Sequence, residues 1–105
     1  MDNGRYYIGT DLKFQITLTA EGFNQDENDY EITFICGSYQ KTYSSANDDF
    51  VKGADGCHYL LIPTDNLSPG MMKMVITAYI PDPDFMEGVR KEVESITLGP
   101  IKPAI

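Results

Sequence analysis

The sequence predicts an all-β protein, built as an antiparallel β-sandwich of seven or eight short strands. Apolar and polar residues alternate along most of its apolar segments, and this period of two is typical of strands with one buried face. Turn-forming residues recur about every ten residues, as they do between the short strands of sandwiches. With 105 residues, the chain has the length of one domain. We therefore expect a single sandwich over residues 1–98 and a proline-containing tail over residues 99–105.

The first half of the chain contains three predicted strands. The first has an apolar face made by Leu12, Phe14, Ile16 and Leu18. An acidic segment rich in turn formers, residues 21–29, predicts a loop, and the sequence YEITFIC after it repeats the alternation. Gly37 interrupts that run, and SYQKTY then predicts a short edge strand.

The middle of the chain predicts shorter elements. The sequence SSANDD indicates a loop, and FVKGADG indicates a brief strand followed by a turn. The sequence CHYLLIP predicts another strand, but Leu60, Leu61 and Ile62 are consecutive, so its buried face is ambiguous.

Between this strand and the next lies PTDNLSPG, residues 63–70. It is too long for a tight hairpin, for which two residues suffice, so it favours a crossing from one sheet to the other. Pro63 ends the strand because proline cannot donate to the ladder. Leu67 is placed to fill the core from the corner, and Pro69 and Gly70 favour a turn into the next strand.

The last part of the chain predicts two strands. In MMKMVITAYI one face carries Met72, Met74, Ile76, Ala78 and Ile80, which we expect in the core. The sequence PDPDFMEGVRK predicts a long turn-rich connection without a sustained apolar stripe, and at most one helical turn. The sequence EVESITL predicts the final strand.

The charge of the chain excludes some classes of partner. Sixteen Asp and Glu residues against eight Lys and Arg give a formal net charge of −8. Such a chain repels phosphate backbones and anionic membrane surfaces, so nucleic-acid and membrane partners are disfavoured, whereas a basic protein partner would suit it. The first residues lack the basic and apolar regions of a signal peptide, so we expect synthesis and folding in a cytoplasm.

The chain has two cysteines and one histidine. Cys36 and Cys57 form no CxxC motif, so a zinc site is disfavoured, and we expect two buried free thiols. A disulfide between them is the alternative. His58 would need a nucleophile and an orienting carboxylate for hydrolytic catalysis, and only loop residues such as Ser45 and Asp55 are nearby in sequence. We therefore expect that the protein is not an enzyme and that it has no cofactor and no metal site.

Two acidic segments are the only candidates for a calcium site. Residues 24–29 and residues 82–84 carry several oxygen ligands, but neither follows the ligand order of an EF-hand loop. Solvated loops explain both segments better.

The corner and its flanking strands resemble a known family. The sequence YLLIPTDNLSPG, followed by an alternating strand, is similar to the passage between the two sheets of immunoglobulin-like domains. Together with IGTDLKFQITLT and YEITF, it resembles the immunoglobulin-like modules of phage virion proteins, among them the N-terminal domain of the lactococcal phage baseplate upper protein and small proteins of phages of gut Bacteroidetes. The resemblance covers most of residues 7–98, lacks the tryptophan, cysteine pair and tyrosine corner of antibody domains, and implies an immunoglobulin-like sandwich that attaches one virion component to another.

One stripe of residues predicts the surface that would make this attachment. On MMKMVITAYI, the alternation that buries Met72 directs Met71, Val75 and Tyr79 outward. An outward apolar stripe is unfavourable on an isolated sandwich and indicates a partner-binding surface. The predicted partner-binding residues are Met71, Val75, Tyr79, Ile35 and Tyr39.

Two functions of different classes follow from these observations. The first is a non-catalytic structural module of a phage virion, in the tail, baseplate or head fibre, which binds other virion proteins or a second copy of itself. The alternative is a carbohydrate-binding or adhesion module of a gut bacterium. That alternative requires an exposed row of aromatic side chains, for which Tyr39, Tyr43 and Tyr79 are the candidates.

Overall fold

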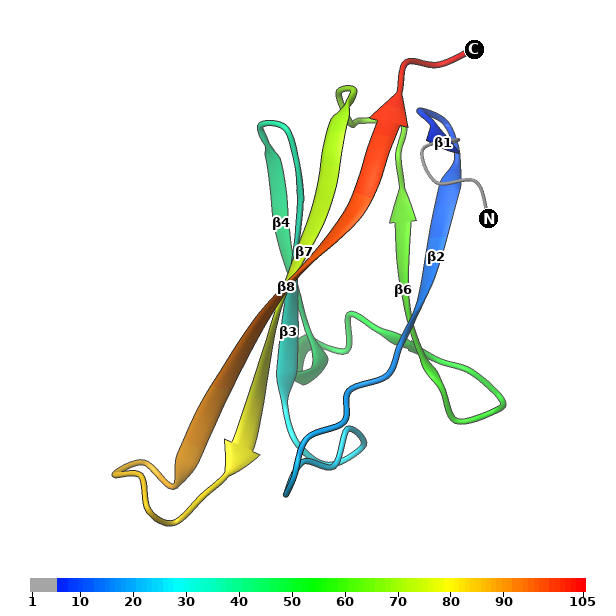
Figure 1. Ribbon diagram of the computed structural model, residues 1–105. Coiled ribbons are helices and arrows are strands. Elements are labelled where there is room, and N and C mark those ends of the chain that lie inside the picture. The colour runs from blue at the N-terminus through cyan, green and yellow to red at the C-terminus, as the bar shows by residue number, and fades with distance from the viewer. Residues whose placement is uncertain (1–5) are drawn as a thin grey trace.

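The structure, a computed structural model, describes residues 6–105 and is 55% strand and 3% helix. Its strands form two sheets, one of five strands in the order β1-β8-β7-β3-β4 and one of three in the order β2-β6-β5 (Figure 1). The elements are β1 (Tyr6–Tyr7), β2 (Asp11–Ile16), β3 (Tyr30–Cys36), β4 (Tyr39–Ser44), the 3₁₀ turn η1 (Ser45–Asn47), β5 (Val51–Lys52), β6 (His58–Pro63), β7 (Gly70–Pro81) and β8 (Val89–Lys102). The predicted all-β class is confirmed, but β7 and β8, with 12 and 14 residues, are longer than the short strands that the sequence predicts.

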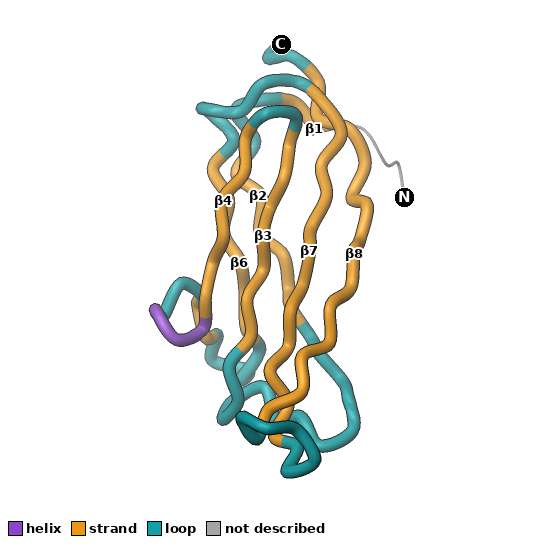
Figure 2. The backbone as a smooth tube through the Cα atoms, turned by 90° about the vertical axis from the view of Figure 1, so that its left-hand side faces the viewer, coloured by secondary structure: helices purple, strands orange, loops and turns teal. Residues whose placement is uncertain are grey.

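The two sheets pack with their apolar faces together. In Figure 2 the strands β4, β3, β7 and β8 lie in front, and β2 and β6 lie behind them. The core between the sheets consists of Leu12, Ile16, Leu60, Ile62 and Leu67 on one side and Tyr30, Ile32, Phe34, Cys36, Tyr43, Met72, Met74, Ile76 and Ile101 on the other. Both layers are needed because neither sheet can bury its apolar face alone.

Period-two alternation predicted the buried faces correctly. Along β3, buried and partly exposed residues alternate without interruption, and β7 does the same from Met72 to Ile80. β3 and β7 are neighbours in the middle of the sheet, in a register that places Ile32 opposite Ile76. On β6 the buried residues are Leu60 and Ile62, while Leu61 is exposed, which resolves the ambiguity of that apolar run.

The segment after β6 crosses between the sheets, as predicted. β6 belongs to the three-stranded sheet and β7 to the five-stranded sheet. Leu67 is buried at the corner. Thr64 is fully buried as well: its hydroxyl donates to the carbonyl oxygen of Thr10 at 2.7 Å and accepts from the amide of Gly9 at 2.8 Å. This threonine therefore joins the crossing to the chain segment between β1 and β2.

The sheet is mixed, which corrects the expectation of antiparallel strands alone. β1 pairs with β8 in parallel, with Tyr6 opposite Ile101 and Tyr7 opposite Lys102. The predicted tail at 99–105 is also shorter than expected, because β8 continues to Lys102 and Ile101 is buried. Pro100 lacks an amide hydrogen, and β1 begins to pair only beyond it, so the proline interrupts the ladder without ending the strand.

The β7–β8 hairpin is longer than predicted and extends past the smaller sheet (Figure 1). Its last strand begins at Val89, three residues before the predicted EVESITL. The turn between the strands is closed by hydrogen bonds from Asp82 N–H to the carbonyl oxygen of Gly88 and from Gly88 N–H to that of Phe85. Residues 17–29 pack on the inner side of this extension, where Leu18 and Phe23 contact the core.

Both cysteines are free thiols, which confirms the predicted chemistry. Cys36 is buried in the core, but Cys57 is only partly buried, which corrects the expectation that both are inaccessible. Burial raises the pKa of the Cys36 thiol. Burial also raises the pKa of the Cys57 thiol, and the negative charge of the nearby Asp55 carboxylate raises it further.

We predict that replacing Thr64 by valine destabilises the protein by about 1–3 kcal/mol, because the Gly9 amide and the Thr10 carbonyl lose the buried hydroxyl to which they are bonded. Urea denaturation measures the change. The matched control is Thr97→Val, at an exposed strand position, for which the change should stay within about 0.5 kcal/mol. Equal losses in the two variants would contradict a special role of the Thr64 hydroxyl.

We also predict that a thiol reagent added to the folded protein modifies Cys57 first and reaches Cys36 only on unfolding, because Cys36 is buried in the core whereas Cys57 is partly exposed. Mass spectrometry after proteolysis identifies the modified residue, and Cys57→Ser removes the early reaction. Modification of Cys36 at the same rate as Cys57 would show that the core opens locally.

Candidate functional site

The outer face of the five-stranded sheet carries four of the five predicted partner-binding residues. Met71, Val75 and Tyr79 alternate with the buried residues of β7. Ile35, on the neighbouring strand β3, lies opposite Lys73 of β7 and so shares its face. Met71 is half exposed, whereas Val75, Tyr79 and Ile35 are partly buried by their neighbours on the sheet. The structure thus places these four residues on one surface of adjacent strands.

Tyr39 does not belong to this surface. It lies opposite Cys36, a core residue, so its side chain is on the inner face of the sheet. Its ring packs edge-on against Phe34, with 6.3 Å between the ring centroids. The sequence placed Tyr39 outward because Gly37 hides the change of phase across the β3–β4 turn.

The aromatic row required for sugar binding also divides between the two faces. Tyr43 is buried on the inner face with Tyr39, while Tyr79 is on the outer face. The Tyr79 hydroxyl donates to a carboxylate oxygen of Glu31 at 2.9 Å. This bond raises the pKa of the tyrosine. The three tyrosines named for a stacking platform are therefore not coplanar neighbours.

The outer face is poor in charge for so acidic a chain. The outward residues of β3, β4, β7 and β8 are Glu31, Thr33, Ile35, Gln40, Thr42, Ser44, Met71, Lys73, Val75, Thr77, Tyr79, Pro81, Val89, Lys91, Val93, Ser95 and Thr97. Glu31 is the one carboxylate among them, and Tyr79 is hydrogen-bonded to it. Four threonines, three valines and the two lysines Lys73 and Lys91 make up about half of these residues, and a surface with so few charges is easily desolvated by a partner.

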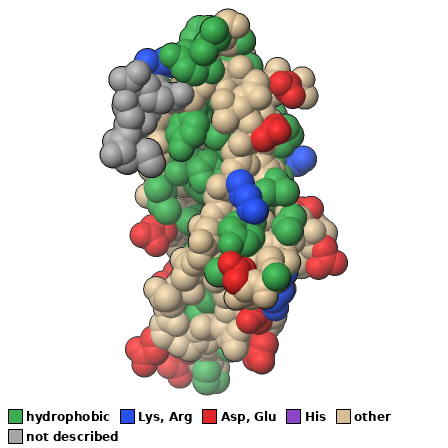
Figure 3. All heavy atoms as spheres, turned by 90° about the vertical axis from the view of Figure 1, so that its right-hand side faces the viewer, with side chains coloured by type: hydrophobic (Ala, Val, Ile, Leu, Met, Phe, Trp, Pro, Cys, Tyr) green, Lys and Arg blue, Asp and Glu red, His purple; other side chains and the backbone are tan. Residues whose placement is uncertain are grey.

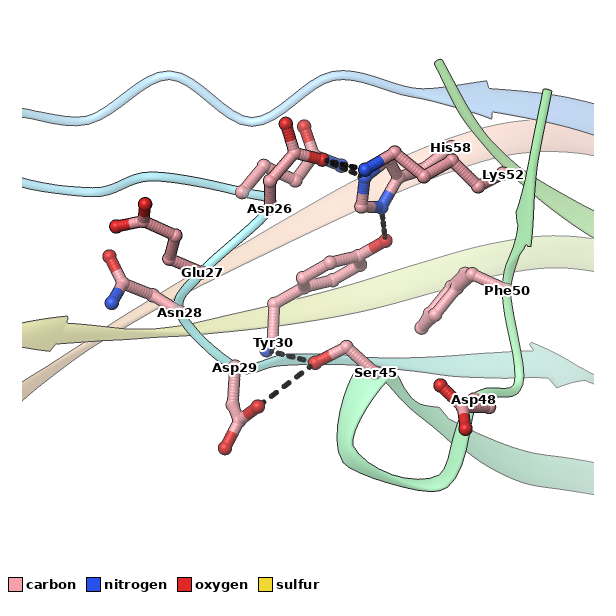
Figure 4. Close-up of a pocket in the computed structure, with 11 residues that line it drawn as sticks. Asp26, Glu27, Asn28, Asp29, Tyr30, Ser45, Asp48, Phe50, Lys52 and His58 are labelled. Carbon is pink, nitrogen blue, oxygen red and sulfur yellow. Dashed lines mark hydrogen bonds and ion pairs between the residues drawn. The ribbon is translucent and has the colours of Figure 1, made fainter. Parts of the chain in front are cut away.

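A polar hollow of about 220 Å³ lies where residues 25–29 meet the start of β6 and the segment after β4 (Figure 4). His58 lies at its centre, between Tyr30 and Asp26. Its Nδ1 is 2.8 Å from the Tyr30 hydroxyl, and its Nε2 is 2.8 Å from an oxygen of Asp26. Lys52 of β5 reaches the same Asp26 oxygen at 2.9 Å.

This chain of contacts joins a core residue to an exposed loop. A neutral imidazole with its proton on Nε2 accepts from the Tyr30 hydroxyl and donates to Asp26, so every polar atom in the row has a partner. Tyr30 is fully buried and packs against Phe50, with 4.6 Å between the ring centroids. Burial raises the pKa of Tyr30, which keeps the hydroxyl protonated as a donor.

The carboxylate at the outer end of this row is held in its charged form. Hydrogen bonds from Lys52 and then from His58 lower the pKa of Asp26 below its ordinary value of 3.8. Asp26 is itself exposed, so solvent weakens these interactions. The network positions the loop at 25–29 against β5 and β6 and neutralises part of its charge.

The hollow does not assemble the hydrolytic groups that the sequence offered. Ser45 accepts from the amide of Tyr30 at 2.9 Å and contacts Asp29, on the other side of the Tyr30 ring from the imidazole (Figure 4). Both nitrogens of His58 are occupied by Tyr30 and Asp26. Asp55, the other sequence candidate, accepts from the Tyr59 hydroxyl and the Cys57 amide instead.

The acidic loops do not converge on a common point. Within residues 6–105, no group of three or more Asp, Glu, His or Cys side chains is arranged to hold a metal ion. Asp82 of the second acidic segment binds Arg90 and the amide of Asp84.

Sequence reasoning missed the two polar contacts that organise this end of the molecule. The sequence predicts Tyr30 and His58 as strand residues, and Asp26 as part of a solvated loop. Their sequence separations, 28 residues for Tyr30 and His58 and 32 for His58 and Asp26, carry no motif. A histidine at the start of a strand and a tyrosine at the start of another gave no signal of their contact.

Comparisons of the chain with protein-family models, with curated proteins and with solved structures find no match. In the part of the chain that the structure describes, no helix has the length and apolar character needed to cross a bilayer.

We predict that Lys52→Gln raises the pKa of Asp26 toward its ordinary value, since Lys52 is the largest cause of the lowered pKa. A carbon-detected NMR titration of the Asp26 carboxyl measures this, and Lys73→Gln, on the outer face, is the control. Because the folded pKa is lowered, the stabilisation is complete above about pH 3.8 and is lost as the pH falls through the folded value. An unchanged titration in Lys52→Gln would contradict the contact.

Proposed function

We propose that the chain is a non-catalytic immunoglobulin-like module of a phage virion, which docks a protein partner on the outer face of its five-stranded sheet. The observation that carries the proposal is that face itself: it is broad, and it contains one carboxylate in a chain with a net charge of −8. The two sheets and the crossing at residues 63–70 support the immunoglobulin-like arrangement. The virion assignment rests on the resemblance of the strand and corner sequences.

The physical basis of docking is the low cost of removing this face from water. Burying a carboxylate without a partner is expensive, whereas burying valine, methionine and threonine methyl groups is favourable. Glu31 accepts one hydrogen bond from Tyr79, which supplies part of what its carboxylate needs when the face is covered. Lys73 lies at the centre of this face, between Ile35 on β3 and Thr97 on β8. Its ammonium would donate a hydrogen bond to an acceptor group of the partner.

The outer face of a sheet suits assembly more than small-ligand binding. A ligand site is normally a concave, mostly apolar cleft with a few placed polar groups. The outward residues instead follow the pleats of four adjacent strands, which is the geometry of a protein interface. The partner would be a second copy of this chain or a different virion protein.

We predict that Lys73 is protected from acetylation in purified virions that contain the chain, and reacts freely in the isolated protein. Lys13 and Lys52, on the three-stranded sheet, are internal controls that should react in both. Mass spectrometry of the peptides gives the ratio, and protection of about ten-fold or more is expected for a fully covered amine. Absence of the chain from the particles would overturn the virion assignment, and equal reactivity of Lys73 and Lys13 in the particles would overturn the assigned face.

A matched pair of variants tests the face independently of the virion. Val75→Lys adds a further charge to the outer face, while Leu61→Lys places one on the outer face of the other sheet, where Leu61 is 46% exposed. Val75→Lys should weaken assembly at least about ten-fold in sedimentation or particle reconstitution, and Leu61→Lys should not. A decrease in stability of Val75→Lys by itself, measured by denaturation, would show that Val75 acts in folding and not in docking.

A further inference from the structure

One side of the sandwich is left open between two strand edges. β2 is the edge of the three-stranded sheet, and β8 is paired on its outer side with β1 only at Ile101 and Lys102. The backbone of residues 89–98 therefore has no strand partner on that side among residues 6–105. A long unpaired edge presents a row of free amide and carbonyl groups that another strand can use.

Apolar side chains line the gap between these two edges. A hollow of about 160 Å³ is enclosed by Phe14, Gln15, Ile16, Thr17, Leu18, Met74, Ile76, Ile96 and Leu98. Ile96 shares its face with Met74, a core residue, yet it is 40% exposed, because no element among residues 6–105 covers it. Hydrophobic side chains reach the surface in the upper half of the view onto the three-stranded sheet, and acidic ones are more numerous in the lower half (Figure 3).

A second, acidic hollow of about 240 Å³ continues the gap toward the β7–β8 turn. It shares Thr17, Leu18 and Ile76 with the apolar hollow and adds Glu92 and Glu94 of β8, and none of the described residues that line it is basic. Glu92 is paired with Arg90, whereas Glu94 makes no ion pair with a described residue. The gap is thus apolar along residues 96–98 and negative along residues 92–94.

We propose that this gap, the β2–β8 groove, binds an extended segment of a partner protein as an additional strand on the free edge of β8. The segment would place apolar side chains, at alternate positions, beside Ile96 and Leu98, and a lysine or arginine beside Glu94. The site is distinct from the outer face, because it uses an edge and the inner side of β8, so either can be correct without the other.

The charges on β8 favour a foreign basic strand over a second copy. Two β8 edges paired with each other would bring Glu92 and Glu94 of both copies together, and like charges across a strand pair are destabilising. Inward-directed charges on an edge strand protect it against such self-pairing. A strand that carries a cation instead neutralises Glu94, which the described residues leave without a counter-ion.

The direction of β8 specifies the order of residues in an antiparallel partner. β8 runs from Val89 to Lys102, so an antiparallel strand passes residues 96–98 first and residues 92–94 afterwards. Its apolar residues would therefore precede its basic residue. Backbone hydrogen bonds along the edge would supply much of the affinity, and the side chains at alternate positions the selectivity.

The test uses two blocked peptides of about nine residues, a usual strand length, added to the full chain. Both contain valine at alternate positions with threonine between, and they differ only in ending with two lysines or with two glutamates. We expect the lysine peptide to bind with a dissociation constant below about 1 mM, and at least about ten-fold more tightly than the glutamate peptide. Backbone amides of residues 92–98 should gain protection from hydrogen exchange, while those of β4, the other edge of the sheet, should not.

Three variants locate the bound peptide. Ile96→Lys should abolish binding, Glu94→Lys should reverse the preference between the two peptides, and Leu61→Lys, on the outer face of the three-stranded sheet, should change neither. Ile96 and Glu94 are exposed, so both variants should remain folded, which circular dichroism and thermal denaturation check. The proposal is overturned if neither peptide binds at about 1 mM, or if binding is indifferent to both Ile96→Lys and Glu94→Lys.

Discussion

The buried hydroxyl of Thr64 fixes the point at which the chain passes from one sheet to the other. Thr64 follows the last residue of β6 and bonds to Gly9 and Thr10, which precede β2. Because β2 and β6 are partners in one sheet, these bonds join the two ends of that pair to the crossing. Leu67 then fills the core beneath the corner, and β7 begins three residues later.

The register of β7 follows from this corner and determines both faces of the larger sheet. β7 has β3 on one side and β8 on the other, so its alternation decides which residues of three strands are inside. A shift by one residue would expose Met72 and bury Lys73. That register is unfavourable, because burying an unpaired charge is costly. The charge-poor outer face and the apolar core are therefore two consequences of one register.

The mismatch in length between the sheets creates the other surfaces. β7 and β8 have 12 and 14 residues, whereas β2 and β6 have six each. The loop of residues 17–29 covers part of the excess, and the Tyr30–His58–Asp26 row attaches that loop to the smaller sheet. No strand covers the remaining gap between β2 and β8 among the described residues, so the groove lies where the smaller sheet ends.

The sequence by itself determined the fold class and most buried faces, because a period of two records which side of each strand avoids water. It also determined the crossing at residues 63–70, since Pro63, Leu67 and Gly70 have local conformational or packing effects that do not depend on distant partners. Four of the five residues of the predicted surface lie together for the same reason: their orientation follows from alternation on β3 and β7.

Only the tertiary structure decided the features that join distant segments. The parallel β1–β8 pair, the inward position of Tyr39 and the contact of His58 with Tyr30 and Asp26 depend on which strands become neighbours. Alternation reports the face of a residue but not its partner across the sheet, and a two-residue strand such as β1 is too short to show a period. The open edge of β8 cannot be predicted from the sequence either, because a strand is an edge strand only if no other strand of the fold pairs with it on that side.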